Sequence, residues 1–258
     1  MKFFRFGRGG RPLVILPGLS IQSVMRVAHM VRKEYEIMEE DFTVYVFDRR
    51  EELPAAYPIR EMARDTAAAL RELGLHKVCL FGASQGGMIA QVIAVEQPEL
   101  VERLVLASTS ACVEEEVFRV IGHWIRLASE RDGVGLYLDS SEKIYPKEMF
   151  ERNRRAIEAA GETVTEEEFT RFIILAEGIR GFDITEELPE IRCPVLLIGA
   201  RDDAVLGAAA TGQIAEHMGA GADVQVHMYD GYGHVCYDTA PDCRERIHQF
   251  LMHIEDTR

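Results

Sequence analysis

Short apolar runs alternate with helical patterns through the first part of the chain, and this alternation limits the folds that the sequence can adopt. The runs lie at residues 13–16, 43–47, 77–81 and 102–106. Between the second and third runs, residues recur at the spacing of one helical face, namely Met62, Thr66, Ala69, Leu70 and Leu73. Strand and helix patterns that alternate in this way are typical of a parallel sheet with helices on both faces. We therefore predict an α/β fold with a mostly parallel sheet.

A further strand is expected before the first run. Residues 3–6 are mainly aromatic, and the glycine-rich segment 7–10 separates them from residues 13–16. A glycine-rich connection between two apolar runs is typical of a β-hairpin. The sequence therefore predicts an antiparallel hairpin of residues 3–6 and 13–16 at the edge of the sheet.

The strand pattern stops after residue 106 and resumes near residue 194. Between these points the sequence is acidic and amphipathic, with helical rather than strand periodicity. We therefore predict a helical cap at residues 113–187, inserted between a first part of the core at residues 1–112 and a second part at residues 188–258. The second part is expected to contain two further strands and a closing helix.

Most apolar residues of the predicted cap are expected to pack in a core. Thr165 and Glu168 form a capping-box pattern at the start of one helix. Pro146 suits the first turn of the helix before it. Trp124 and Phe172 are candidates for the roof of a substrate pocket.

The charge balance excludes several classes of partner. Lys and Arg together number 29 against 43 Asp and Glu, which gives a formal net charge of −14. A strongly acidic chain repels the phosphates of nucleic acids and anionic lipid surfaces, so we expect neither as a partner. No apolar run is long enough to cross a bilayer or to resemble a signal peptide, and we expect a cytoplasmic protein. The oligomeric state stays open, including a homo-oligomer.

The five cysteines predict neither a disulfide framework nor a metal centre. Their number is odd, and they form no Cys-x-x-Cys pair and no cluster with histidine. We expect reduced thiols, no metal ion and no organic cofactor. The cysteines are Cys79, Cys112, Cys193, Cys236 and Cys243.

The sequence Gly-Ala-Ser-Gln-Gly at residues 82–86 is the strongest candidate for chemistry. It follows an apolar strand run and precedes an apolar helical pattern that starts at Met88. In a nucleophile elbow of the form Gly-x-Ser-x-Gly, the serine takes a strained backbone conformation, and the glycines avoid collisions with the neighbouring strand and helix. Ser84 is therefore the candidate nucleophile. The alternative is a purely structural turn, because glycine-rich turns are common in α/β proteins.

Two later loops supply the groups that a serine nucleophile needs. Asp202 and Asp203 follow the strand run that ends at residue 198, and His234 stands in the sequence Gly-Tyr-Gly-His after the last strand run. His234 is the candidate general base, and Asp202 is the candidate acid that orients it. Either aspartate could instead cap the turn that follows, so Asp203 stays open as the acid.

Together these motifs resemble the α/β-hydrolase family, and the resemblance covers essentially the whole chain. The matching features are the sequence Asp-Arg-Arg at residues 48–50, the elbow around Ser84, the loops that carry Asp202 and His234, and Pro241 behind the histidine. The resemblance implies an α/β-hydrolase fold with an inserted helical cap. It also implies a catalytic triad of Ser84, Asp202 and His234, in the chain order that this family uses.

An oxyanion hole made of backbone N–H groups is expected beside the nucleophile. Gln85, which follows Ser84, supplies one donor, and Leu19 is the matching position for the second. Many relatives have His-Gly in this loop, whereas this chain has Pro17-Gly18. The expected activity is hydrolysis of a small-molecule carboxylic ester, thioester or lactone through an acyl-enzyme.

Other functions fit the same residues. A carbon–carbon bond hydrolase or a cofactor-free perhydrolase or haloperoxidase would use the same triad, and a non-catalytic ligand receptor on this fold would use none of it. The glycine-rich oxyanion loop typical of the carbon–carbon hydrolases is missing, which disfavours that reaction. Epoxide hydrolases and haloalkane dehalogenases have aspartate at the elbow, so Ser84 disfavours both.

Overall fold

The computed structural model describes residues 1–253, and its strands form one seven-stranded sheet. The strand order is β1-β3-β2-β4-β5-β6-β7, and every neighbouring pair is parallel except β1 with β3. This arrangement confirms the predicted mostly parallel α/β sheet. The strands are β1 Phe3–Phe6, β2 Arg11–Leu16, β3 Phe42–Phe47, β4 Val78–Ala83, β5 Val101–Ala107, β6 Val195–Ala200 and β7 Val224–Tyr229.

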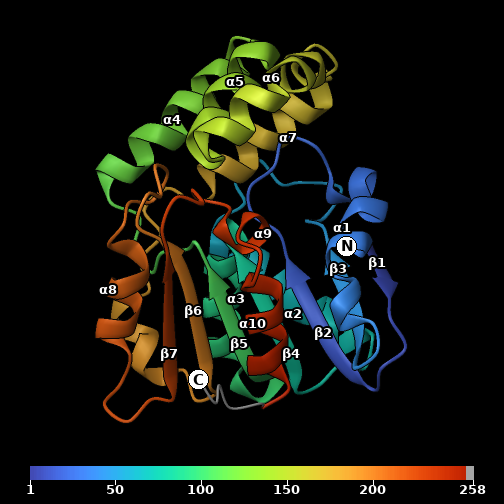
Figure 1. Ribbon diagram of the computed structural model, residues 1–258, viewed down its shortest axis with the longest axis vertical. Coiled ribbons are helices and arrows are strands. Elements are labelled where there is room, and N and C mark those ends of the chain that lie inside the picture. Colours follow the sequence, from blue (N-terminus) through green and yellow to red (C-terminus); the bar gives the residue numbers. More distant parts are fainter. Residues whose placement is uncertain (254–258) are drawn as a thin grey trace.

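Helices cover both faces of the sheet (Figure 1). Successive side chains of a strand point to opposite faces, so the sheet buries two apolar clusters. In β4, for example, Leu80 packs in the cluster that includes α2 and α3, and Phe81 packs in the cluster that includes α10. The helices are α1 Ala28–Glu34, α2 Ile59–Glu72, α3 Gln85–Glu96, α8 Ala210–His217, α9 Cys236–Thr239 and α10 Cys243–Leu251, with short 3₁₀ helices at Val24–Val27, Glu36–Met38, Pro98–Leu100 and Thr185–Glu190.

The predicted antiparallel strand at the sheet edge is confirmed, but its predicted pairing with residues 13–16 is wrong. β1 pairs antiparallel with β3, and β3 lies between β1 and β2. The glycine-rich segment crosses the start of β3, where the Gly9 N–H donates to the Phe42 carbonyl at 3.3 Å. A Cβ atom on Gly9 would fall 1.8 Å from the Asp41 carbonyl carbon. This close crossing carries the first strand to the outer edge of β3.

Four helices lie between β5 and β6, namely α4 Glu115–Ser129, α5 Gly133–Ile144, α6 Lys147–Gly161 and α7 Glu166–Glu177. They form a layer beyond one end of the sheet, at the top of Figure 1. The chain enters and leaves this layer through a short antiparallel pairing, in which Val113 N–H donates to the Phe182 carbonyl and Ile184 N–H donates to the Ala111 carbonyl. We call α4–α7 the helical layer. Residues 254–258 of the predicted second core part lie outside the described residues.

The helix boundaries that the sequence predicts within the helical layer agree only in part with the structure. The capping box is confirmed, because the Thr165 hydroxyl accepts from Glu168 N–H and the Glu168 carboxylate accepts from Thr165 N–H. Pro146 is the N-cap of α6 rather than a residue of its first turn. The helix α5 is a finding that the sequence did not predict, since its first residues include two glycines, which have low helix propensity.

The described residues meet the requirements for neither a membrane-spanning helix, nor a metal site, nor a disulfide. Among residues 1–253, no helix is both long and apolar enough to cross a bilayer. Within the same range, no group of three or more His, Cys, Asp and Glu side chains is arranged to hold a metal ion. All five cysteines are free thiols, as the odd count suggested.

The close approach of α3 to β2 generates a stability prediction. A Cβ atom on Gly86 would fall 2.0 Å from the Leu16 carbonyl oxygen, whereas a Cβ atom on Gly212 in α8 would meet nothing within 4 Å. We expect Gly86→Ala to lower the free energy of unfolding by about 2 kcal/mol or more, and the control Gly212→Ala to raise it by up to about 1 kcal/mol. Urea unfolding measures both. Wild-type stability of Gly86→Ala would contradict the close approach.

Candidate active site

Ser84 forms the turn between β4 and α3. Its backbone angles are φ 50° and ψ −120°, a conformation that is rare for a residue with a side chain. Its N–H donates to the Ala107 carbonyl at 2.9 Å, and its carbonyl accepts from the Thr109 hydroxyl at 2.7 Å. A Cβ atom on Gly18 would lie 3.2 Å from the Ser84 Cβ, so the loop after β2 passes directly beside the serine. The strained turn is therefore held by bonds from β5 and the segment after it.

Asp203, and not Asp202, contacts the candidate histidine. The distance from His234 Nδ1 to Asp203 Oδ2 is 2.8 Å, and both side chains are almost fully buried. The other oxygen, Asp203 Oδ1, accepts from the Val205 and Leu206 N–H groups at 2.8 and 3.0 Å. The assignment of Asp202 as the orienting acid is therefore wrong, and the open alternative, Asp203, has the required contact.

Asp202 binds the backbone of the histidine loop instead. Its Oδ1 accepts from Gly231 N–H and its Oδ2 accepts from Gly233 N–H, each at 3.0 Å. Both aspartates leave the end of β6, and consecutive side chains point apart. The two carboxylates thus reach different parts of one loop, and Asp202 fixes the backbone that presents His234.

The surroundings of Asp203 favour its ionised form. Burial alone would raise the pKa of this carboxyl, but the His234 ring and the Leu206 and Val205 N–H groups together lower the pKa below its ordinary value. An ionised carboxylate at Nδ1 stabilises the tautomer that carries the proton on this nitrogen. In that tautomer Nε2 is the free acceptor of the ring.

A cavity of about 450 Å³ brings Ser84 and His234 together between the core and the helical layer. A volume of this size suits a small organic molecule. Both sequence candidates for the pocket roof line it, and Trp124 and Phe172 are only 4% and 3% exposed. Tyr137 of α5 also lines the cavity, although the sequence did not predict this helix.

The two candidate oxyanion donors flank the serine. Gln85 is the first residue of α3, so its backbone N–H has no partner within the helix. Leu19 lines the cavity in the loop after β2. Arg49 ties this loop to the elbow, because its Nη2 donates to the Pro17 carbonyl at 2.8 Å and to Gln85 Oε1 at 3.2 Å.

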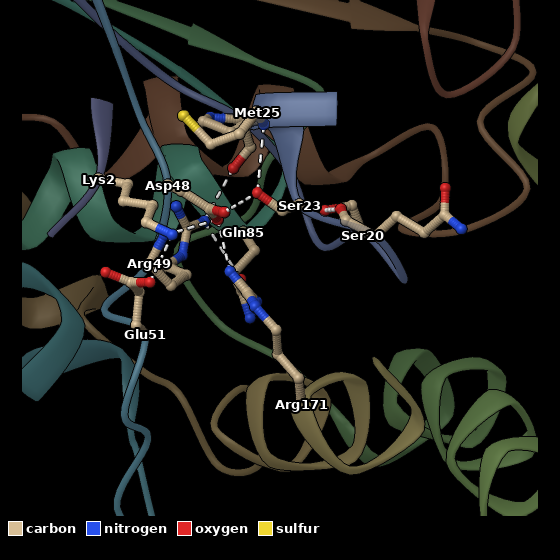
Figure 2. Close-up of polar contacts among 11 residues, drawn as sticks. Lys2, Ser20, Ser23, Met25, Asp48, Arg49, Glu51, Gln85 and Arg171 are labelled. Carbon is tan, nitrogen blue, oxygen red and sulfur yellow. Dashed lines mark hydrogen bonds and ion pairs between the residues drawn. The ribbon is translucent and has the colours of Figure 1, made fainter. Parts of the chain in front are cut away.

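Arg49 belongs to a buried polar network that connects the elbow to α7 (Figure 2). Asp48 Oδ1 accepts from Arg49 N–H at 2.7 Å and pairs with Arg171 of α7. Gln85 Nε2 donates to the Leu175 carbonyl, also in α7, at 2.7 Å. Burial lowers the pKa of the Arg49 guanidinium to about 10, so the group stays charged at neutral pH. The motif at residues 48–50 was the only sequence signal for this network.

Comparisons with known proteins identify the family of the chain. A family model described as serine aminopeptidase, S33, matches residues 35–238. The "Putative carbamate hydrolase RutD" of Agrobacterium fabrum is 26% identical over 234 residues, which are 87% of this chain and 88% of that protein.

Solved structures superpose on the whole molecule. An α/β-hydrolase enzyme from a Medee basin deep-sea metagenome library has a TM-score of 0.86 at 18% identity, over 100% of this chain and 96% of that one. The enol-lactonase of Burkholderia xenovorans LB400 has a TM-score of 0.79 at 20% identity, over 97% and 96%. The chain is therefore an α/β hydrolase and belongs to the enzyme family described as serine aminopeptidase, S33.

Proposed function

We propose that this hydrolase cleaves a small carboxylic ester, thioester or lactone through an acyl-enzyme on Ser84. The observation that supports this most strongly is the arrangement of Ser84, His234 and Asp203 at one cavity. Ser84 and His234 line this cavity together, and Asp203 Oδ2 lies 2.8 Å from His234 Nδ1. This contact leaves His234 Nε2 as the ring nitrogen that can accept a proton. A serine hydrolase needs a nucleophile, a base and an acid in this relation, and it needs no cofactor.

In the proposed reaction, His234 Nε2 takes the proton of the Ser84 hydroxyl while Oγ attacks the acyl carbonyl. Asp203 stabilises the imidazolium that forms. The backbone N–H groups of Leu19 and Gln85 bind the oxyanion of the tetrahedral intermediate. The alcohol or thiol then leaves with the proton from His234. A water molecule gives its proton to His234 and attacks the acyl-enzyme, and Ser84 Oγ leaves with that proton as the acid is released.

We also propose that residues 113–187 act as a cap over the core parts 1–112 and 188–258. The cavity wall supports this role, because Ile121, Trp124 and Phe172 come from the helical layer. Removal of apolar surface from water stabilises a bound apolar group. The wall therefore favours a substrate with a hydrophobic acyl or alcohol portion.

Other reactions at the same serine are alternatives that the substrate series must include. A carbamate, the compound class named for the Agrobacterium relative, also has a carbonyl carbon bonded to a heteroatom. Carbon–carbon bond hydrolysis and perhydrolysis would likewise need an activated Ser84, whereas a ligand receptor would not. A cytoplasmic location, and the absence of nucleic acid and membrane partners, stay predictions from the sequence.

Replacement of the nucleophile tests the serine mechanism. Ser84→Ala should abolish both hydrolysis of phenyl acetate and labelling by a fluorophosphonate probe, because each requires an activated serine. The thermal melt should stay near that of the wild type. The matched control is Ser129→Ala, which removes an exposed hydroxyl bonded to its own helix. Wild-type turnover by Ser84→Ala would refute the mechanism.

The two aspartates give a paired prediction. Asp203→Asn should lower kcat for phenyl acetate by about 10⁴, because the amide favours the wrong histidine tautomer. Asp202→Asn should weaken two backbone contacts of the histidine loop. It should therefore cost about 1 kcal/mol of stability and less than about tenfold in kcat. A near-normal kcat in Asp203→Asn together with a strongly lowered kcat in Asp202→Asn would reverse the assignment.

Cavity residues of the helical layer should control substrate size. Trp124→Leu and Phe172→Leu should change the ratio of kcat/KM for 4-nitrophenyl hexanoate and acetate by about fivefold or more, since a pocket contact discriminates by roughly 1–3 kcal/mol per methylene. Phe169→Leu is the control, because Phe169 is buried in the same helix as Phe172 but does not line the cavity. If the kcat/KM ratio of the two esters stays at the wild-type value in all three variants, Trp124 and Phe172 contribute only to core packing.

A further inference from the structure

The cavity contains a carboxylate that the proposed reaction does not use. Asp238 belongs to α9, four residues after His234, and lines the same cavity as Ser84 and His234. A substrate that occupies this cavity therefore shares it with Asp238 as well as with Ser84.

Asp238 lines the cavity, and part of its side chain is exposed. Its side chain is 43% exposed. Burial nevertheless raises the pKa of this carboxyl above its ordinary value, against a smaller lowering by Arg244.

Structural bonds account for only one oxygen of this carboxylate. The Tyr35 hydroxyl donates to Asp238 Oδ1 at 3.1 Å, and Arg244 Nη2 lies 3.4 Å from the same oxygen. Among residues 1–253, no side chain donates a hydrogen bond to Oδ2. A role in anchoring Tyr35 and Arg244 thus explains the contacts of Oδ1, but it does not explain Oδ2.

The charge of Asp238 is only partly neutralised. Arg244 Nη2 is closer to Glu34, at 2.8 Å from Oε2, than to Asp238, at 3.4 Å. One guanidinium therefore lies between two carboxylates, so Arg244 does not neutralise Asp238 alone. A substrate carboxylate would be repelled here.

Two tyrosines line the cavity together with Asp238. They are Tyr145 and Tyr237. Burial raises the pKa of both hydroxyls, and the Asp238 charge raises it further. An ionised carboxylate beside aromatic rings attracts an organic cation through charge pairing and cation–π contact.

We propose that Asp238 binds a positively charged nitrogen of the substrate, and that the preferred substrates are esters with an ammonium group a short spacer away from the acyl carbonyl. Asp238 is then a specificity-determining residue that takes no part in proton transfer. This inference rests on the proposed function, because it assumes that the ester reacts at Ser84.

The test compares acetylcholine with 3,3-dimethylbutyl acetate, which has the same shape but carbon in place of the charged nitrogen. The measured quantity is the ratio of kcat/KM for the two esters, since a general loss of activity cancels in the ratio. We expect the wild type to prefer acetylcholine by about tenfold or more, Asp238→Asn to lose most of this preference and Asp238→Glu to keep part of it.

The matched control is Glu142→Gln. It removes the same unit of charge from an exposed position of α5 beside the cavity-lining Ser141, and Glu142 itself does not line the cavity. Its ratio should stay within about twofold of the wild type, because solvent and salt screen exposed charges. A wild-type ratio near one, or an unchanged ratio in Asp238→Asn, would overturn the inference.

A binding measurement separates this inference from the proposed function. Calorimetry of choline with Ser84→Ala, and with Ser84→Ala combined with Asp238→Asn, requires no reaction. Choline binding that is about tenfold weaker in the double variant supports the cation site even if neither ester is hydrolysed. Equal or undetectable binding in both proteins overturns it. Absence of ester hydrolysis and of probe labelling in the wild type refutes the proposed function alone.

Discussion

The buried guanidinium of Arg49 is the constraint on which the geometry of the candidate active site depends. Arg49 is 3% exposed, and a buried charge without hydrogen-bond partners costs several kcal/mol. Its Nη2 binds the Pro17 carbonyl beside one candidate oxyanion donor and the Gln85 side chain beside the other. A shift of either loop would take an acceptor from the guanidinium. The free-energy cost of leaving the guanidinium without an acceptor therefore keeps the two loops in their relative positions.

The same constraint extends to the helical layer. Asp48 accepts from the Arg49 backbone and pairs with Arg171 of α7, and both side chains of the ion pair are at least four-fifths buried. Loss of one partner of a buried pair typically costs 3–5 kcal/mol. Because Gln85 also donates to the Leu175 carbonyl, α7 is bound to the residue that follows Ser84. The helix α7, which contributes Phe172 to the cavity wall, is therefore bonded directly to the elbow.

Local sterics explain what the sequence could predict, and long-range contacts explain what it could not. The elbow around Ser84 is set by glycines within the motif, and its strained turn appears where the motif predicts it. The choice between Asp202 and Asp203 depends on how the chain turns after β6, which residue types do not encode. The partner of β1 likewise depends on a loop that crosses β3. The Arg49 network joins segments far apart in the chain, so the motif at residues 48–50 marks one part of it and not its partners.

The donors around each carboxylate of the cavity region distinguish the roles that these groups can take. Asp203 receives two backbone N–H groups and the His234 ring, so its charge is satisfied and directed at the histidine. Asp202 is likewise occupied by two backbone N–H groups. Asp238 has weaker contacts on one oxygen and shares its guanidinium with Glu34. A satisfied carboxylate orients its protein partner, whereas a carboxylate with a free oxygen in a cavity lowers its energy by binding a cation from outside. On the two proposals made above, a substrate that contacts both Ser84 and Asp238 would gain affinity and orientation together.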